Sequence, residues 1–321
     1  MPFLGVASPT SLANKTQLYY EDRSAEQART IVFLHDWPFD RQEWAYPVAL
    51  FSRGYRTVTI DLPGFGRSDQ PGGLINEEGM ARDVGALVTV LGLNNIILVG
   101  AGLGAAVAVT YATRFPRTLA GLVLVGAISP RWISGAGFSQ GVSRPYVEGL
   151  LEGSETSWPD RLGKYVGSLF HTAVGKPTLD WFVSMGLGAS LYAVQQTLIA
   201  LRDSDQRDAL GRISVPTAVF QGIHDQVVPL AIGEYLAANI PGASLIRFEH
   251  SGHLVWIDEK FRFNKELTGF VEERVFGQEV PPPDVERLPG GGERLPYKKI
   301  ATRSHRGQPK IEGTVGQIYE K

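Results

Sequence analysis

The sequence predicts an α/β protein built on a doubly wound, mostly parallel sheet. Two observations predict it: short apolar segments of strand length alternate with segments of helical pattern, and the strand segments are nearly continuous apolar runs. Continuous runs are typical of strands that helices cover on both faces, and the alternation is typical of parallel sheets. A third observation is that the alternation stops near residue 128 and resumes near residue 212.

The first half of the chain accounts for most of the expected sheet. "TIVFLH" is apolar enough to be a buried strand, and "GMARDVGALVTVLGL" repeats its apolar residues at helical spacing. The expected strands lie at residues 17–22, 30–35, 56–61, 95–100 and 119–127, and the expected helices at residues 79–93 and 103–115.

Residues 128–211 differ in composition from the alternating strand and helix segments that precede them. They contain many aromatic residues and several segments of helical pattern, which predict a helical insertion. Strand and helix patterns then return in "VPTAVFQG", "AIGEYLAANI", "ASLIRFEH" and "DEKFRFNKELTGFVEERVF". The predicted domains are therefore a core of residues 1–127 and 212–276 and an insertion of residues 128–211.

Residues 277–321 form a predicted C-terminal extension in which Pro, Gly and charged residues dominate. Such a composition cannot bury enough surface to fold alone. We expect the extension to be disordered, to wrap on the body of the protein, or to serve as a contact in a homo-oligomer or with another partner.

Composition excludes several classes of protein. The 321 residues are 43% hydrophobic, which is ample for a large core, and carry a net charge of only −2. Basic residues are not clustered before the C-terminus, so we expect neither a nucleic-acid nor a membrane-surface partner. With no cysteine, disulfides, thiolate metal sites and a cysteine nucleophile are excluded. The start of the chain lacks the pattern of a signal peptide and no apolar run is long enough for a membrane span, so a cytoplasmic protein is expected.

Three loops that follow predicted strands carry residues suited to chemistry. "HDWPFD" places Asp36 and Trp37 where main-chain N–H groups could face an anionic oxygen, although a simple turn explains it equally well. "DLPGFGRSD" is a tight turn. Asp225 follows a strand in "QGIHDQVVP", and His253 follows the next strand in "RFEHSGH". Nearby His224 and His250 are interpreted as structural.

The stretch "LVGAGLGAA" has glycine at the position where a related pattern has a catalytic serine. It turns from a strand into a small-residue helix, where the pattern G-x-S-x-G places an enzyme's serine nucleophile, but its central residue is Gly102. The order of elbow, acid and histidine along the chain is the order found for catalytic triads on this architecture. Glycine accepts the strained backbone of such an elbow easily, because it has no Cβ.

Together these motifs resemble the α/β-hydrolase superfamily, in particular its esterase and cofactor-free haloperoxidase-like branch, from about residue 19 to residue 276. The resemblance implies that Asp225 is the acid and His253 the base. It implies an oxyanion hole from the N–H groups of Leu103 and of Asp36 or Trp37. It also implies that the insertion is a helical lid whose apolar lining binds a small-to-medium hydrophobic substrate, for which the candidates are Trp132, Phe138, Phe170, Trp181 and Tyr192.

The nucleophile does not carry over, because Gly102 has no side chain. We therefore expect a cofactor-independent enzyme of secondary metabolism that uses acid–base and oxyanion catalysis without a covalent intermediate. Cyclisation, lyase, isomerisation and direct hydrolysis chemistry all fit. No metal is expected, since the adjacent His and Asp residues at 35–36 and 224–225 seldom converge on one ion.

Other interpretations stay open. The chain could be a serine esterase inactivated by a Ser-to-Gly substitution at position 102, whether natural or made in the laboratory, and Gly102→Ser would then restore ester hydrolysis. A relocated serine at Ser68, Ser129 or Ser251 is a further alternative. The protein could also be a non-catalytic binder of a small ligand, or a scaffold that engages a partner through its extension.

Overall fold

The structure is a computed structural model that describes residues 3–7, 15–23, 29–70, 73, 75–277, 286–287 and 293–294. The chain divides into two compact units, Met1–Glu279 and Val280–Lys321. In the second unit the described residues form two short strands, β9 (Glu286–Arg287) and β10 (Glu293–Arg294), which pair antiparallel. The rest of the predicted extension beyond Gly277 lies outside the described residues.

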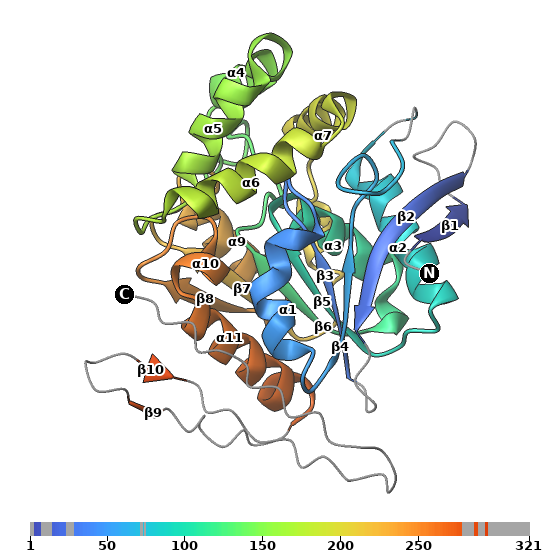
Figure 1. Cartoon of the computed structure of the whole chain (residues 1–321). Helices are drawn as coiled ribbons and strands as arrows, with labels where there is room; N and C mark the ends of the chain where they lie inside the picture. The colour runs from blue at the N-terminus through green and yellow to red at the C-terminus, as the bar shows by residue number, and fades with distance from the viewer. Residues whose placement is uncertain are drawn as a thin grey trace, which may run out of the picture. The chain divides into compact units, whose positions relative to one another are not determined.

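An eight-stranded sheet forms the centre of the first unit (Figure 1), in the order β1-β2-β4-β3-β5-β6-β7-β8. The pairs β1–β2 and β2–β4 are antiparallel, and all other neighbours are parallel. The predicted, mostly parallel α/β fold is confirmed. The strands are β1 (Phe3–Ala7), β2 (Lys15–Arg23), β3 (Thr30–Leu34), β4 (Arg56–Ile60), β5 (Ile96–Ala101), β6 (Leu119–Val125), β7 (Thr217–Gly222) and β8 (Ser244–Phe248).

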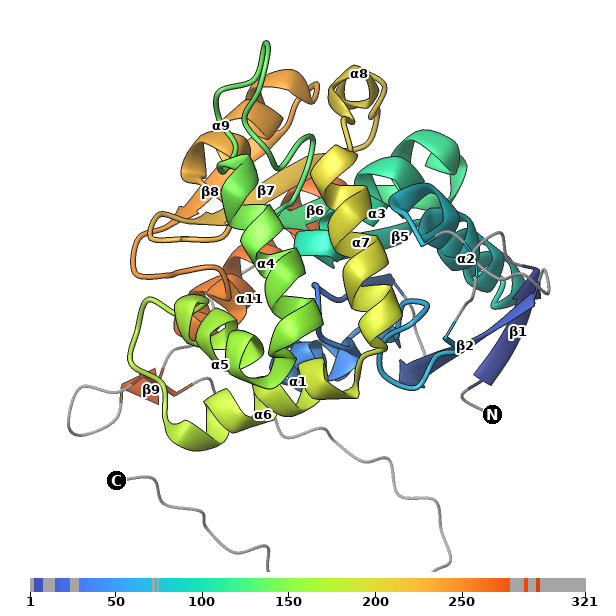
Figure 2. The same ribbon diagram turned by 90° about the horizontal axis from the view of Figure 1, so that it is seen from above.

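Helices cover both faces of this sheet, as the apolar strands require. Figure 2 shows α1 and α11 on one side and α2 and α3 on the other. Short 3-10 helices η1 (Arg41–Trp44) and η2 (Pro116–Thr118) and the π-helical turn η3 (Phe270–Val275) complete these layers. The flanking helices are α1 (Ala45–Phe51), α2 (Glu77–Val90), α3 (Gly102–Arg114), α9 (Leu230–Asn239), α10 (Val255–Asp258) and α11 (Lys260–Gly269).

Between β6 and β7 the chain forms a set of helices, in the segment where the sequence predicts a helical insertion. Figure 1 shows them gathered above one end of the sheet. Contacts of Trp37, which follows β3, with Trp158 and Tyr165 place α5 over the carboxyl ends of the strands. The helices are α4 (Arg144–Thr156), α5 (Trp158–Ser168), α6 (Lys176–Gly188), α7 (Leu191–Asp203) and α8 (Arg207–Leu210).

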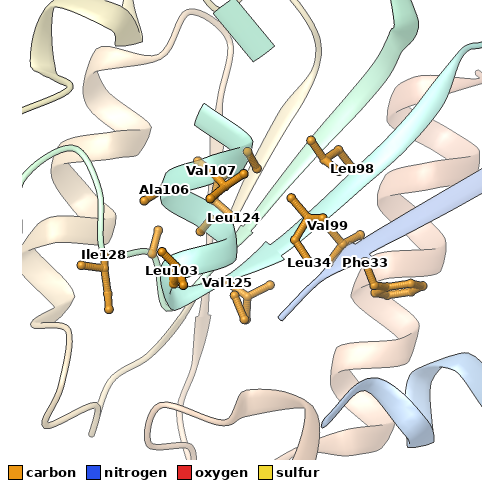
Figure 3. Packing of buried hydrophobic residues seen from close by; sticks show 14 of the residues in the cluster. Phe33, Leu34, Leu98, Val99, Leu103, Ala106, Val107, Leu124, Val125 and Ile128 are labelled. Carbon is orange, nitrogen blue, oxygen red and sulfur yellow. The ribbon is translucent and has the colours of Figure 1, made fainter. Parts of the chain in front are cut away.

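The turn from β5 into α3 is packed too closely for side chains. A Cβ on Gly104 would lie 2.4 Å from the carbonyl oxygen of Leu34, and one on Gly100 would lie 2.3 Å from that of Gly104. Figure 3 shows Leu103 and Val107 of α3 among buried residues of the neighbouring strands. Helix α3 therefore packs closely against the end of β3. Among the described residues, no helix is both long and apolar enough to cross a lipid bilayer.

Candidate active site

Four loops at the carboxyl ends of parallel strands bring the predicted site residues together. Asp36 follows β3, Gly102 follows β5 and begins α3, and Asp225 follows β7. His253 lies in the loop after β8. Because parallel strands end at the same edge of a sheet, residues distant in sequence meet here, where ligands bind in open α/β sheets.

His253 lies between two aspartate side chains. Its Nδ1 is 2.7 Å from Asp225 Oδ2, and its Nε2 is 2.9 Å from Asp36 Oδ2. All three side chains are buried, His253 at 1% exposure and both aspartates at 0%. We call Asp36, His253 and Asp225 the acid–base array. The predicted pairing of Asp225 with His253 is present, and Asp36 adds a second carboxylate that the sequence did not assign to this chemistry.

The Asp36 carboxylate lies where a side chain of residue 102 would be. A Cβ built on Gly102 would lie 1.6 Å from Asp36 Oδ1 and 2.1 Å from its Cγ, far inside any allowed contact. Gly102 also has a φ of +45°, a region that L-residues with a side chain rarely adopt. Only glycine at position 102 is compatible with this position of Asp36.

The predicted oxyanion-hole donors are already engaged. The N–H groups of Trp37 and Leu103 both donate to Asp36 Oδ1, at 2.7 and 2.8 Å, and the N–H of Asp36 donates to Glu43 Oε1 at 2.9 Å. The expectation that these groups would receive a substrate oxygen needs correction, because the side chains of Asp36 and Glu43 already hold them. A substrate oxygen could use the N–H groups of Trp37 and Leu103 only if the Asp36 side chain moved away.

The two carboxylates decide the charge of His253. Burial alone lowers the pKa of His253, but the charges and hydrogen bonds of Asp225 and Asp36 outweigh burial and raise it to about 10. His253 is therefore an imidazolium at neutral pH, donating from both ring nitrogens. A buried charge is tolerated when it is paired and hydrogen-bonded, and here both conditions are met.

Each end of the array is fixed by further contacts. Asp225 Oδ1 accepts from the N–H groups of Val227 and Val228, and Gln221 Nε2 donates to Asp225 Oδ2. These bonds hold the carboxylate in line with His253. At the other end, burial and then the charge of Asp36 raise the pKa of Glu43 well above its ordinary value, and Glu43 Oε1 accepts from the Asp36 N–H.

The neighbouring His35 is structural. Its Nε2 accepts from the Leu62 N–H at 2.9 Å, so its Nδ1 carries the proton and donates to the Asp36 carbonyl oxygen. Burial lowers the pKa of His35, which keeps the ring neutral. The ring ties the loop after β3 to the loop after β4 and thereby fixes the main chain of Asp36.

Comparison with known proteins agrees with this geometry. The pattern of the Alpha/beta hydrolase family matches residues 31–265. The chain belongs to that family. It is 32% identical over 255 residues to the AB hydrolase superfamily protein YisY of Bacillus subtilis (strain 168), covering 79% of this chain and 94% of YisY.

Relatives with named activities include esterases and haloperoxidases. The non-heme haloperoxidase of Rhodococcus erythropolis is 27% identical over 283 residues, which cover 85% of this chain and all of that protein. Among solved structures, an esterase from Exiguobacterium antarcticum superposes with a TM-score of 0.79 at 30% identity, covering 83% of this chain and 98% of the esterase. The similarity to this family therefore extends over most of the chain.

The rival residues have other partners in the structure. The rings of His224 and His171 stack with centroids 3.6 Å apart, and the main-chain N–H of His250 donates to Glu259. The described residues contain no group of three or more His, Cys, Asp or Glu side chains arranged to hold a metal ion. The serine candidates also bond elsewhere: Ser68 to the Asp61 carbonyl, Ser129 to Gln206 and Ser251 to Glu259.

The predicted substrate-binding aromatic residues are spread over the insertion. The main chain of Phe170 lies against Gly252, beside His253, whereas Tyr192 is exposed and bonds Gly73. Trp132 donates to the Val227 carbonyl. Phe138 packs on Tyr235, and Trp181 packs on Tyr46 and Phe182. Their role in substrate binding stays a prediction.

Sequence reasoning missed two aromatic residues that pack on Trp37, next to Asp36 of the array. The Trp37 ring packs against Trp158 and Tyr165 of α5, with centroids 5.8 and 5.1 Å away, and the Tyr165 hydroxyl lies 3.5 Å from the Trp37 carbonyl oxygen. Burial and then the charge of Asp36 raise the pKa of Tyr165 well above its ordinary value, so its hydroxyl stays neutral. The only signal in the sequence is the regular spacing of apolar residues on α5. That spacing is the same for helix residues that pack in the core and for residues that line a substrate site.

Gly126, at the end of β6, lies directly against the His253 ring. A Cβ there would meet His253 Cε1 at 2.8 Å and Nδ1 at 2.9 Å. Gly126→Ala should therefore displace the imidazole from Asp225 and destabilise the fold by about 1–3 kcal/mol, through overpacking and a φ of +48°. Urea unfolding measures the loss. Gly163→Ala, at a helical glycine where the added Cβ meets nothing within 4 Å, is the control and should not destabilise the protein.

The raised pKa of His253 predicts a pH-dependent stability. The ordinary pKa is 6.5 and the folded value is about 10, so the imidazolium stabilises the fold fully below pH 6.5, and the stabilisation is lost as pH rises toward 10. The free energy of unfolding should fall by at most about 1.4 kcal/mol per pH unit in this window. Urea unfolding of wild type and His253→Gln between pH 7 and 9 checks it, and parallel slopes for the two proteins would contradict it.

Proposed function

We propose that this protein is an enzyme that uses His253, rather than a serine, to move protons on a small-to-medium hydrophobic molecule. The observation that carries the proposal is the buried array itself, with an imidazole held between two carboxylates directly beside Gly102. Burying these charges is costly unless the surrounding structure is arranged for it. Strongly shifted ionisation in such a place is typical of functional sites.

The array is suited to acid–base catalysis. Asp225 fixes His253 through Nδ1, which leaves Nε2 as the nitrogen that faces the position of the missing nucleophile. A positioned acid or base of this kind contributes about 10²–10⁴-fold to a rate. Because no serine is present at position 102, no acyl-serine intermediate forms there.

The surroundings favour an apolar substrate. Trp37, which directly follows Asp36, packs against Trp158 and Tyr165 of α5, and all three side chains are almost completely buried. In this proposal the helices between β6 and β7 act as a lid that opens to admit the substrate and closes over it. In the same proposal, the structure with its buried site is the state in which this lid is closed.

The alternative of an inactivated serine esterase is less well supported. A serine at position 102 would collide with Asp36, and the donors needed for an acyl oxyanion are bound to the same carboxylate. A pure binding protein needs neither Asp225 nor a charged His253, whereas proton transfer uses both.

The test starts from the natural substrate pool. Wild type, His253→Ala and Asp180→Asn are each incubated with a small-molecule extract of the cells that make the protein, and compounds consumed or formed are followed by mass spectrometry. Asp180 is exposed on α6, where it pairs with Lys176, and serves as the control. We expect wild type and the control to convert the same apolar compound and His253→Ala to leave it unchanged. Conversion by His253→Ala at the wild-type rate would refute the proposal.

A further inference from the structure

We propose that Asp36 is a catalytic base, that His253 is its partner acid, and that the pair moves a double bond into conjugation with the carbonyl group of a hydrophobic ketone. The inference rests on the proposed function, because it uses the proton of His253. It adds a second reacting side chain and names the substrate class, a β,γ-unsaturated ketone. The substrate passes through an enol and forms no bond to the protein.

Asp36 and His253 are each anchored through one of the two polar atoms at the end of the side chain. Asp36 Oδ1 accepts from the N–H groups of Trp37 and Leu103, and His253 Nδ1 is held by Asp225. The other two atoms, Asp36 Oδ2 and His253 Nε2, are bonded to each other at 2.9 Å. A substrate that inserts into this bond therefore meets an anchored acceptor on one side and an anchored donor on the other.

The charge of His253 suits the oxygen of an enolate. Asp225 and Asp36 raise the pKa of His253 to about 10 against the effect of burial, so the imidazolium is a weak acid. Such an acid does not protonate a ketone outright. It stabilises the carbonyl oxygen as negative charge develops there and then gives it the proton. Enzymes that remove a proton next to a carbonyl group pair a carboxylate base with a hydrogen-bond donor in this way.

Acyl transfer needs groups that this site does not offer. It needs free N–H donors for the acyl oxygen, and Asp36 Oδ1 holds those of Trp37 and Leu103. It also needs a nucleophile at the elbow, where Gly102 has no side chain. A proton shift needs neither and consumes no water, which agrees with the burial of His253 and Asp36 at 1% and 0% exposure.

The substrate class follows from the strength of the base. Carboxylates in general are weak bases, so they remove a C–H proton only where neighbouring groups make it acidic. The α carbon of a β,γ-unsaturated ketone meets this condition, because it lies between the carbonyl group and the double bond and its enol is conjugated. The apolar surroundings of Asp36 favour a hydrophobic ketone of this kind.

The reaction balances without a co-reactant. Asp36 Oδ2 takes the proton of the α carbon, the electrons of that C–H bond form a new C=C bond, and the carbonyl oxygen takes the proton of His253 Nε2. The enol then returns its O–H proton to Nε2, and the γ carbon takes the proton from Asp36. A conjugated ketone, the Asp36 carboxylate and the His253 imidazolium remain.

The first experiment uses two probes, allyl phenyl ketone and the β,γ-unsaturated isomer of cyclohexenone, and follows the ultraviolet absorbance of the conjugated products. We expect wild type to isomerise at least one of them, more slowly when the α carbon carries deuterium. Asp36→Asn keeps the shape of the side chain but not its basicity, and should be at least about 10²-fold slower. Asp180→Asn, which removes an exposed carboxylate on α6, is the control and should match wild type. Isomerisation of neither ketone, or wild-type rates in Asp36→Asn, overturns the inference.

The second experiment separates a base from a side chain that only fills space. Asp36→Gly is assayed with added difluoroacetate, fluoroacetate and acetate, which differ little in size and increase in basicity in that order. We expect these anions to restore part of the activity, and acetate to restore the most. No rescue, or equal rescue by all three anions, would show that Asp36 does not take the proton.

Failure of this inference differs from failure of the proposed function. If both ketones stay unchanged while a compound of the cell extract is still consumed only when His253 is present, the inference is wrong and the proposed function stands. If His253→Ala converts the extract compound at the wild-type rate, the proposed function itself is refuted.

Discussion

Replacing Gly102 by serine will not by itself create ester hydrolysis, whereas Gly102→Ser combined with Asp36→Gly will. The single substitution places a Cβ 1.6 Å from Asp36 Oδ1 and leaves the N–H groups of Trp37 and Leu103 occupied. The second substitution removes the obstructing carboxylate and frees both donors. Each such donor is worth about 10²–10³-fold in acyl transfer, so the double variant should exceed the single one by at least about 10²-fold.

Hydrolysis of p-nitrophenyl acetate measures this difference. Asp36→Gly alone is the control for the freed donors without a nucleophile, and we expect it to be inactive. Esterase activity in Gly102→Ser equal to that of the double variant would contradict the structure, because Asp36 would then not occupy the elbow. That result would support the inactivated-esterase interpretation instead.

Removing His253 should cause the largest loss of turnover on the natural substrate. His253 is the member of the array whose ring nitrogens face both carboxylates, so His253→Ala removes the proton carrier. We expect kcat to fall by about 10²–10⁴-fold, while the affinity for the substrate, which rests on apolar contacts, changes little.

His224→Ala is the matched control for that measurement. His224 precedes Asp225 but stacks on His171, away from the array's hydrogen bonds, so its removal should leave kcat nearly unchanged. Equal losses in the two histidine variants would show that the effect comes from disturbing the loop and not from lost proton transfer. Steady-state kinetics with the compound identified in the extract separates kcat from KM.

The sequence predicts the fold well because the fold depends on local pattern. Apolar runs such as the one at β3 are buried in full, and Gly100 and Gly104 lie where no side chain fits. The pairing of Asp225 with His253 could also be predicted, from the order of elbow, acid and histidine along the chain and from the resemblance to the α/β-hydrolase superfamily. Strand β1 was not predicted; among the described residues it lies at the edge of the sheet and pairs antiparallel with β2.

The role of Asp36 could not be predicted from the sequence. Asp36 and Gly102 are 66 positions apart, and their coupling depends on a side-chain position that no pattern encodes. The sequence analysis assigned a role only to the main-chain N–H groups of the loop that contains Asp36, and none to the Asp36 carboxylate. Likewise, the sequence pattern does not separate Trp158 and Tyr165 from ordinary helix residues, and only their packing against Trp37 distinguishes them.

The coupling also bears on the origin of Gly102. A single laboratory replacement of serine by glycine would start from a protein in which Asp36 had to lie elsewhere, because the two side chains share one space. The Asp36 carboxylate instead makes a full set of bonds with Trp37, Leu103 and His253. The position of Asp36 therefore fits glycine, and not serine, at position 102.

Titration of His253 by NMR tests the acid–base array most directly, since it needs no substrate. The chain has six histidines, and comparison with His253→Gln assigns the resonance. The array predicts a pKa of about 10 in wild type, lowered by about 1–3 pH units in Asp36→Asn, which removes one of the two flanking charges. A wild-type His253 that titrates near its ordinary value of 6.5, and does so equally in Asp36→Asn, would contradict the array and the catalytic role built on it.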